Sequence, residues 1–181
     1  MLVDLHFVNL SHTKCIDELI GGQIEALENA GIKGVIFSKI DYLVYPEAYA
    51  VLAFNSEKKL VGGARIYQRS LEKVLPLEHD ESYLPEEFRK YITEKKNFFE
   101  LRGLWVAKEY IGNDLGKEIT RKCIENAYKL GAAGIVATGQ KRTYEYYGKY
   151  FNFEIDSRIP PFPFPDKRFE TVVAFHKKEN W

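Results

Sequence analysis

The chain has 181 residues, of which 45% are hydrophobic and 29% are charged, and its formal net charge is zero. This length is enough for one domain with a sizeable hydrophobic core, and the composition is ordinary for a globular protein. The balanced charge argues against general nucleic-acid binding, and no apolar run is long enough to cross a membrane. We therefore expect a single domain over residues 1–181, with no nucleic-acid or membrane partner.

Cysteine and histidine usage gives a second set of expectations. Cys15 and Cys123 lie on predicted apolar helix faces and do not resemble a disulfide framework. Buried thiols suit a reducing compartment, and the N-terminus lacks a basic region followed by an apolar one, so we expect a cytoplasmic protein. The four histidines are scattered without a ligand partner at helical spacing, so no metal site is expected.

The N-terminal part of the chain alternates predicted strands and helices. A short strand is predicted over 5–10 and a helix over 16–30, with Gly21-Gly22 favouring a break or kink in its middle. Residues 49–54 and 59–67 have the pattern of a hairpin. Within its second strand, Gly62-Gly63 indicates a bulge or a close backbone approach.

A charged segment over 69–96 is predicted to be helical, with a good helix start at Pro85-Glu86-Glu87. Near the C-terminus, the proline and phenylalanine residues of 159–165 exclude a central strand. A last strand is predicted over 169–177.

The stretch over 97–155 is the most informative part of the chain. It contains a strand over 98–107, a glycine-containing turn over 108–117, a helix over 115–130 and an apolar strand over 133–138. This order predicts two parallel neighbouring strands with a right-handed crossover. A strand that enters a helix in this way directs backbone N–H groups and the positive end of the helix dipole at one point, which suits a phosphate or pyrophosphate.

This order of elements resembles the GCN5-related N-acyltransferase (GNAT) family over nearly the whole chain. The signature lies in Leu104 to Lys117, where the family has a strand and then a turn of the form Gln/Arg-x-x-Gly-x-Gly/Ala. The run Tyr144 to Phe153 looks like the family's late tyrosine helix, which leads to a Gly-Phe pair and a strand. The resemblance implies an α/β (α+β) fold with a mixed central sheet of about six to seven strands flanked by helices.

The chain departs from the family pattern at three positions. If Gly116 takes the last position of the turn, Ile111 stands where Gln or Arg is usual and Asp114 stands where Gly is usual. Gly112 supplies a neighbouring glycine. A carboxylate at Asp114 would repel a pyrophosphate unless it turns outward to water. In the late motif, Asn152 replaces Gly.

The resemblance implies transfer of an acyl group, most simply acetyl, from a CoA thioester to an amine of an unidentified small-molecule or protein acceptor. The co-substrate would be acetyl-CoA or another acyl-CoA, with no metal. The pantetheine arm would run along the strand and the phosphates would lie at the turn. The expected donor-binding residues are Leu104, Trp105, Val106, Gly112, Asn113, Leu115, Gly116, Lys117, Gln140 and Tyr144.

Catalysis in such an enzyme needs a base for the amine and an acid for the departing thiolate. Glu100 is the best candidate for the base, although it could equally pair with Arg102 or solvent. Tyr147 is the best candidate for the acid, with Tyr146 next, and either could instead serve in packing.

Two other hypotheses stay open. Residues 62–67, 75–78 and 99–104 look like the branch that includes acyl-homoserine-lactone synthases, which take acyl chains from acyl carrier protein. In that case the acidic carrier would contact five basic residues, namely Arg69, Arg89, Lys90, Lys95 and Lys96. A simpler interpretation is that these side chains, and that of Arg65, are exposed to solvent. The degenerate turn also fits a binding module that has lost catalysis.

The Pro/Phe segment over 159–165 could cover the acceptor pocket, or it could contact a second subunit in a homodimer.

Overall fold

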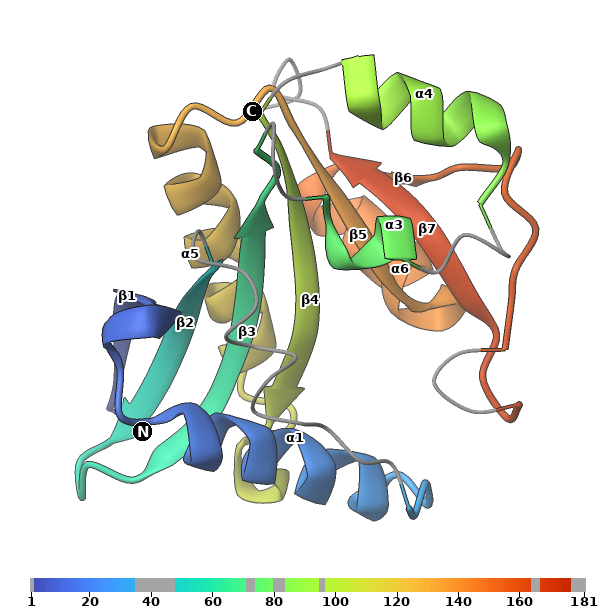
Figure 1. Cartoon of the computed structure of the whole chain (residues 1–181). Helices are drawn as coiled ribbons and strands as arrows, with labels where there is room; N and C mark the ends of the chain where they lie inside the picture. Colours follow the sequence, from blue (N-terminus) through green and yellow to red (C-terminus); the bar gives the residue numbers. More distant parts are fainter. Residues whose placement is uncertain are drawn as a thin grey trace. The chain divides into compact units, whose positions relative to one another are not determined.

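The computed structural model describes residues 2–34, 48–70, 74–79, 84–94, 97–163 and 167–176. Its strands are β1 (Val3–Asn9), β2 (Ala48–Asn55), β3 (Leu60–Gln68), β4 (Phe98–Val106), β5 (Gly134–Gln140), β6 (Phe153–Ile155) and β7 (Thr171–His176). Its α-helices are α1 (Ile16–Asn29), α3 (Pro76–His79), α4 (Glu86–Glu94), α5 (Leu115–Lys129) and α6 (Lys141–Phe151), shown in Figure 1.

The strands form one seven-stranded mixed sheet in the order β1-β2-β3-β4-β5-β7-β6, which confirms the expected fold class. The predicted parallel pair is present, because β4 and β5 pair in parallel from Phe98↔Gly134 to Leu101↔Ala137. The last strand, β7, pairs antiparallel with both β5 and β6. The residues group into two compact units, the first made of 1–66 and 103–126 and the second of 67–102 and 127–181.

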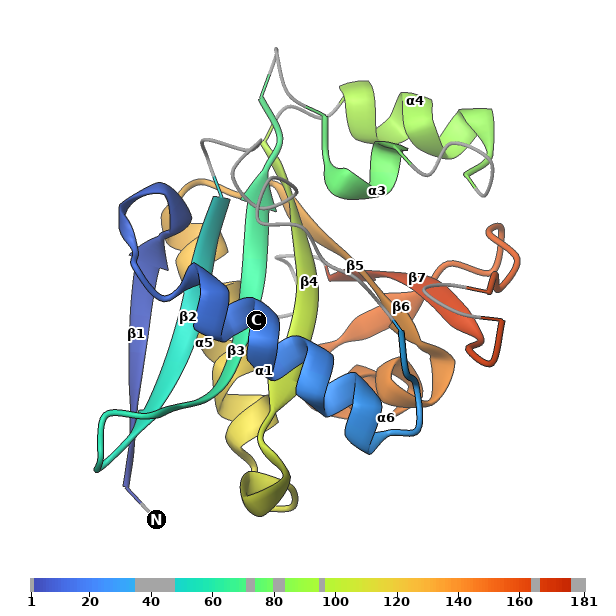
Figure 2. The ribbon, with the colours of Figure 1, turned by 60° about the horizontal axis from the view of Figure 1, so that its bottom comes forward.

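In the first unit, helices cover both faces of the strands (Figures 1 and 2). The adjacent glycines of β3 show how closely the helices approach, because neighbouring strand residues face opposite sides of a sheet. A Cβ at Gly62 would lie 3.0 Å from Ile119 of α5, and one at Gly63 would lie 2.8 Å from Leu19 of α1. The glycine pair therefore marks a close approach on each face, as the sequence predicted.

Helix α1 runs unbroken from Ile16 to Asn29, so the predicted break at Gly21-Gly22 is wrong. Packing explains why a glycine stands there. A Cβ on Gly22 would overlap the indole ring of Trp105, with its nearest ring atom at 2.2 Å, whereas a Cβ on Gly21 would meet nothing within 4 Å. Because Gly22 has no side chain, α1 can pack directly against the indole ring of Trp105.

In the second unit, aromatic side chains join α4 to the strands. The Tyr91 ring centroid lies 5.9 Å from that of Phe98 and 6.0 Å from that of Phe175, both in edge-to-face geometry. The helices described within the charged segment are α3 and α4, and α4 begins at Glu86 directly after Pro85, as expected. Lys95 and Lys96 lie outside the described residues.

The remaining differences are small. Strand β5 continues to Gln140, two residues beyond the predicted end, and Gln140 stands at the N-cap position of α6 without a side-chain capping hydrogen bond. In the Pro/Phe segment, Phe162 makes an isolated bridge to Thr171, while Phe164 and Pro165 lie outside the described residues. Cys123 is buried, Cys15 is half-buried, and both are free thiols. None of the helices in the described ranges has the length and apolar character needed to span a membrane.

A buried histidine on β7 makes the stability of the second unit depend on pH. His176 is 1% exposed, and its Nδ1 lies 2.7 Å from the hydroxyl of Tyr128. Burial lowers the pKa of His176 to about 4, because a charged imidazolium is poorly solvated there. The pKa of this ring is therefore lower in the folded chain than in the unfolded chain, where it is near 6.5.

We predict that the free energy of unfolding is highest above pH 6.5 and falls as the pH drops toward 4. The slope is at most about 1.4 kcal/mol per pH unit, since the unfolded chain takes up the proton that the folded chain refuses. Denaturant titrations from pH 4 to 8 measure this. His176→Gln should reduce the slope, and His12→Gln, at an exposed position, should not. An unchanged slope in His176→Gln would contradict the assignment.

Candidate functional site

The turn before α5 contains two residues with left-handed backbone conformation. Gly112 has φ +89° and Asp114 has φ +58°. The carbonyl of Asp114 accepts the first helical hydrogen bonds, from Lys117 N–H at 2.9 Å and from Glu118 N–H at 3.0 Å. The N–H groups of Leu115 and Gly116 have no backbone acceptor within the part of the chain that the structure describes. These donors are therefore free to point at a ligand at the helix N-terminus.

The carboxylate of Asp114 turns away from the protein. Its side chain is 68% exposed, and Oδ1 lies 2.8 Å from Nζ of Lys117. Water and this cation together screen the negative charge that the sequence placed at the turn. The Asp is also one of the few non-glycine residues that tolerate a left-handed conformation. The substitution thus preserves the shape of the turn where the family usually has Gly.

The end of β4 carries the other donor-binding candidates of the first unit. Leu104 and Val106 are half-buried, whereas the Trp105 ring is buried against Gly22 and Gly63. Within β4, Gly103 adopts φ +66°, and a Cβ there would lie 2.4 Å from Nη2 of Arg65. Arg65 is 4% exposed and donates to Oε1 of Gln23 at 2.9 Å. The prediction that Arg65 is solvated is therefore wrong, because the missing side chain at Gly103 makes room for its guanidinium.

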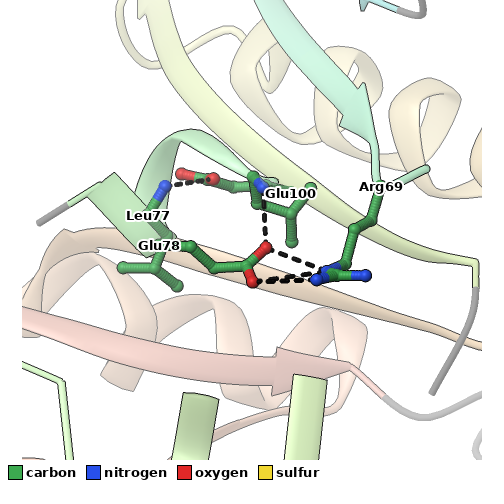
Figure 3. A network of polar contacts seen from close by, with 5 residues as sticks. Arg69, Leu77, Glu78 and Glu100 are labelled. Atoms are coloured by element: carbon green, nitrogen blue, oxygen red, sulfur yellow. Dashed lines mark hydrogen bonds and ion pairs between the residues drawn. The ribbon is translucent and has the colours of Figure 1, made fainter. Parts of the chain in front are cut away.

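In the second unit, Glu100 is fully buried in a polar network (Figure 3). Its Oε2 accepts the N–H of Leu77 at 2.8 Å, and its Oε1 lies 3.4 Å from Nη1 of Arg102. The alternative considered for Glu100, a pairing with Arg102, is present in the structure. Arg69 is also not solvated, since its Nε lies 3.0 Å from Oε2 of Glu78 and its side chain is 10% exposed.

The tyrosines of α6 differ in burial. Tyr144 and Tyr147 are buried, with ring centroids 6.4 Å apart, whereas Tyr146 is 45% exposed. Gly139 of β5 leaves room for the Tyr144 ring, because a Cβ there would lie 2.8 Å from it. Burial, with smaller contributions from Tyr147 and Glu100, raises the pKa of Tyr144 well above its usual range. Tyr144 is thus held protonated.

The structure describes the predicted residues in two groups, each inside its own unit. The first unit holds Leu104, Trp105, Val106, Gly112, Asn113, Leu115, Gly116 and Lys117. The second holds Glu100, Gln140, Tyr144, Tyr146 and Tyr147. Within the described ranges, no group of three or more His, Cys, Asp or Glu side chains is arranged to hold a metal ion.

A comparison with models of protein families gives a match over most of the chain. The model described as "Acetyltransferase (GNAT) family" matches residues 26–153, which is well over half of the chain. This protein belongs to the GNAT family. No curated protein matches the chain significantly.

Solved structures agree with this GNAT assignment at the level of the fold. An N-acyl amino acid synthase, FeeM, from uncultured soil microbes has a TM-score of 0.75 at 13% identity, covering 99% of this chain and 94% of its own. A GNAT-family acetyltransferase from Staphylococcus aureus Mu50 gives 0.63 at 17%, covering 97% and 99%. The NatC complex bound to Gag peptide and CoA gives 0.67 at 10%, covering 98% and 99%.

Sequence reasoning missed the contact between Gly103 and Arg65. A glycine inside a predicted strand was the available signal, because such a residue often marks a close approach. The partner could not be inferred, since Arg65 lies 38 positions earlier in the chain.

We predict that Gly103→Ala lowers the free energy of unfolding by about 1–3 kcal/mol, because it adds backbone strain and displaces the buried Arg65 guanidinium. Chemical denaturation measures the loss. Gly31→Ala is the matched control, since Gly31 also has positive φ (+84°) but has nothing within 4 Å of the new Cβ. Equal losses in the two variants would show that the contact with Arg65 costs nothing.

Proposed function

We propose that this protein is an N-acyltransferase that moves an acyl group, most simply acetyl, from a CoA thioester to an amine. Membership of the GNAT family supports acyl transfer in general. The acetyl group, the CoA donor and the amine acceptor, which is a small molecule or a protein, are our proposal. We also propose that the protein acts in the cytoplasm, where acyl-CoA donors are available.

The observation that carries the proposal is the backbone of the turn before α5. Left-handed Gly112 and Asp114 deliver the chain into a long helix whose first N–H groups, on Leu115 and Gly116, have no backbone acceptor. A pyrophosphate at this point would accept these hydrogen bonds and gain from the helix dipole. Lys117 would exchange its ion pair with Asp114 for one with the phosphate. The pantetheine arm would then extend along Leu104–Val106, in the manner of an added strand.

The chemistry we propose is direct attack of the acceptor amine on the thioester carbonyl. The new C–N bond forms as the C–S bond breaks, the amine gives one proton to water, and the departing thiolate of CoA takes one from a tyrosine hydroxyl. A tyrosine hydroxyl is protonated at neutral pH and can give the thiolate its proton. Tyr147 remains the proposed donor of that proton. Tyr144 lies beside it on α6, and burial raises the pKa of Tyr144, which makes it the weaker acid.

A carrier-protein donor is the second candidate, and Ile111 favours it. This side chain is 69% exposed at the head of the turn, where the family usually offers a polar group to the CoA phosphates. An acyl carrier protein presents only one phosphate and a protein surface, so it demands less of the turn. Arg69 is a poor carrier contact, because its side chain is 10% exposed and pairs with Glu78. Lys90 stays accessible, since its side chain is 75% exposed and its 4.0 Å pair with Glu94 is weak.

We predict that Asp114→Asn raises the affinity for CoA about three- to fivefold at low salt, because it removes a carboxylate near the pyrophosphate and releases Lys117. The gain should shrink as salt increases. Isothermal titration calorimetry measures both effects. Asn is chosen because it also tolerates the left-handed conformation of this position.

The matched control is Glu125→Gln, which removes a carboxylate from α5 about three helical turns beyond Asp114. Its affinity for CoA should stay at the wild-type value. An Asp114→Asn affinity equal to that of the control would place the phosphates elsewhere. Absence of CoA binding in every variant, together with salt-sensitive binding of acyl carrier protein, would favour the second candidate.

For catalysis, we predict that Tyr147→Phe lowers the turnover number by roughly 10²-fold while the dissociation constant of CoA stays constant, because only the proton donor is removed. Steady-state kinetics with an acceptor found by screening amines provides the measurement. Tyr150→Phe, at a 54% exposed position of the same helix, is the control and should keep full activity. If Tyr147→Phe turns over normally and Tyr144→Phe does not, the proton comes from Tyr144.

A further inference from the structure

The segment around α3 is held in place by a buried polar network (Figure 3). A helix of four residues is not stable by itself, so contacts with the rest of the second unit must fix its position. Glu78 supplies one of them: its Oε2 accepts the N–H of Leu75 at 2.7 Å and the Nε of Arg69 at 3.0 Å. The backbone N–H of Arg69 in turn donates to the carbonyl of Phe98 in β4 at 2.9 Å.

Glu100 supplies the second contact, from β4 itself. Its side chain is 0% exposed, and its Oε2 accepts the N–H of Leu77 at 2.8 Å. Leu75 and Leu77 are also buried, at 0% and 1% exposure, on either side of Pro76. The carboxylate is therefore enclosed by the segment that it binds.

The two carboxylates accept two backbone N–H groups at the start of α3, and the N–H of Glu78 donates to the carbonyl of Leu75 at 2.9 Å. Leu75 N–H donates to Glu78, Leu77 N–H donates to Glu100, and Pro76 has no N–H to satisfy. A buried N–H without an acceptor costs roughly 1–3 kcal/mol, so removing either carboxylate would loosen the segment. Arg69 and Arg102 balance the two negative charges.

We infer that Glu100 is a positioning residue, which fixes α3 on β4, and that it is not the base of the reaction. A base needs a carboxylate that can reach the acceptor amine and take its proton, whereas this one is enclosed and bound to Leu77. What the position requires is a hydrogen-bond acceptor, and an uncharged amide oxygen can supply that. The inference rests on the proposed acyl transfer only for its kinetic test.

The first test needs no substrate. Amide hydrogen exchange of Leu77 is compared among the wild type, Glu100→Ala and Glu100→Gln, with Glu57→Gln in the exposed β2–β3 turn as the control. We expect Leu77 N–H to exchange at least tenfold faster in Glu100→Ala and to return to within about threefold of the wild type in Glu100→Gln. Unchanged exchange at Leu77 in Glu100→Ala would overturn the inference, and it would do so whether or not the protein transfers acyl groups. If Glu100→Ala does not fold, faster exchange at Leu77 in Glu100→Gln would overturn it instead.

The second test uses kcat/KM and its pH profile with the acceptor found by screening. We expect Glu100→Ala to lose most of the activity and Glu100→Gln to recover it to within about fivefold of the wild type, with the same pH profile. A loss of 10²-fold or more in Glu100→Gln, with Leu77 exchange unchanged, would show that Glu100 is the base after all.

Discussion

Left-handed backbone conformation shapes the path of the chain from β4 into α5. Gly103, Gly112 and Asp114 all have positive φ within twelve residues. At Gly103 the absence of a side chain admits the guanidinium of Arg65 against the strand. At Gly112 and Asp114 the left-handed backbone leads the chain into the helix, and the N–H groups of Leu115 and Gly116 have no backbone acceptor within the described residues. The proposed phosphate site depends on these conformations more than on any side chain.

The same constraint explains two departures from the family pattern. Asp114 and Asn152 stand where the family usually has Gly, and each adopts a left-handed conformation, with φ +58° and +53°. Asp and Asn are the residues, after Gly, that most readily accept this conformation. The backbone therefore keeps its course at both positions, although the motif is lost in the sequence. At Asp114 the added charge is directed outward and paired with Lys117.

The sequence predicted those features that depend on local pattern. The amphipathic stripe of α5, the hairpin of β2 and β3, the parallel pair of β4 and β5, and the start of α4 after Pro85 all follow from periodicity or turn residues. It failed where distant residues decide. Gly22 makes room for the ring of Trp105, and Arg69 is held by an ion pair with Glu78. Neither an unbroken α1 nor a buried arginine could therefore be predicted from the adjacent residues in the sequence. The role of Glu100 belongs to this second class, because its partner Leu77 lies 23 positions away.

The central claim is that the turn before α5 binds the phosphates of the acyl donor. A ¹⁵N–¹H NMR titration tests it most directly, with CoA in one series and 4′-phosphopantetheine in another. The account predicts that CoA produces its largest amide shifts at residues 112–117, led by Leu115 and Gly116, and that 4′-phosphopantetheine produces smaller shifts there. Saturable CoA binding that leaves these amides unmoved would contradict the account.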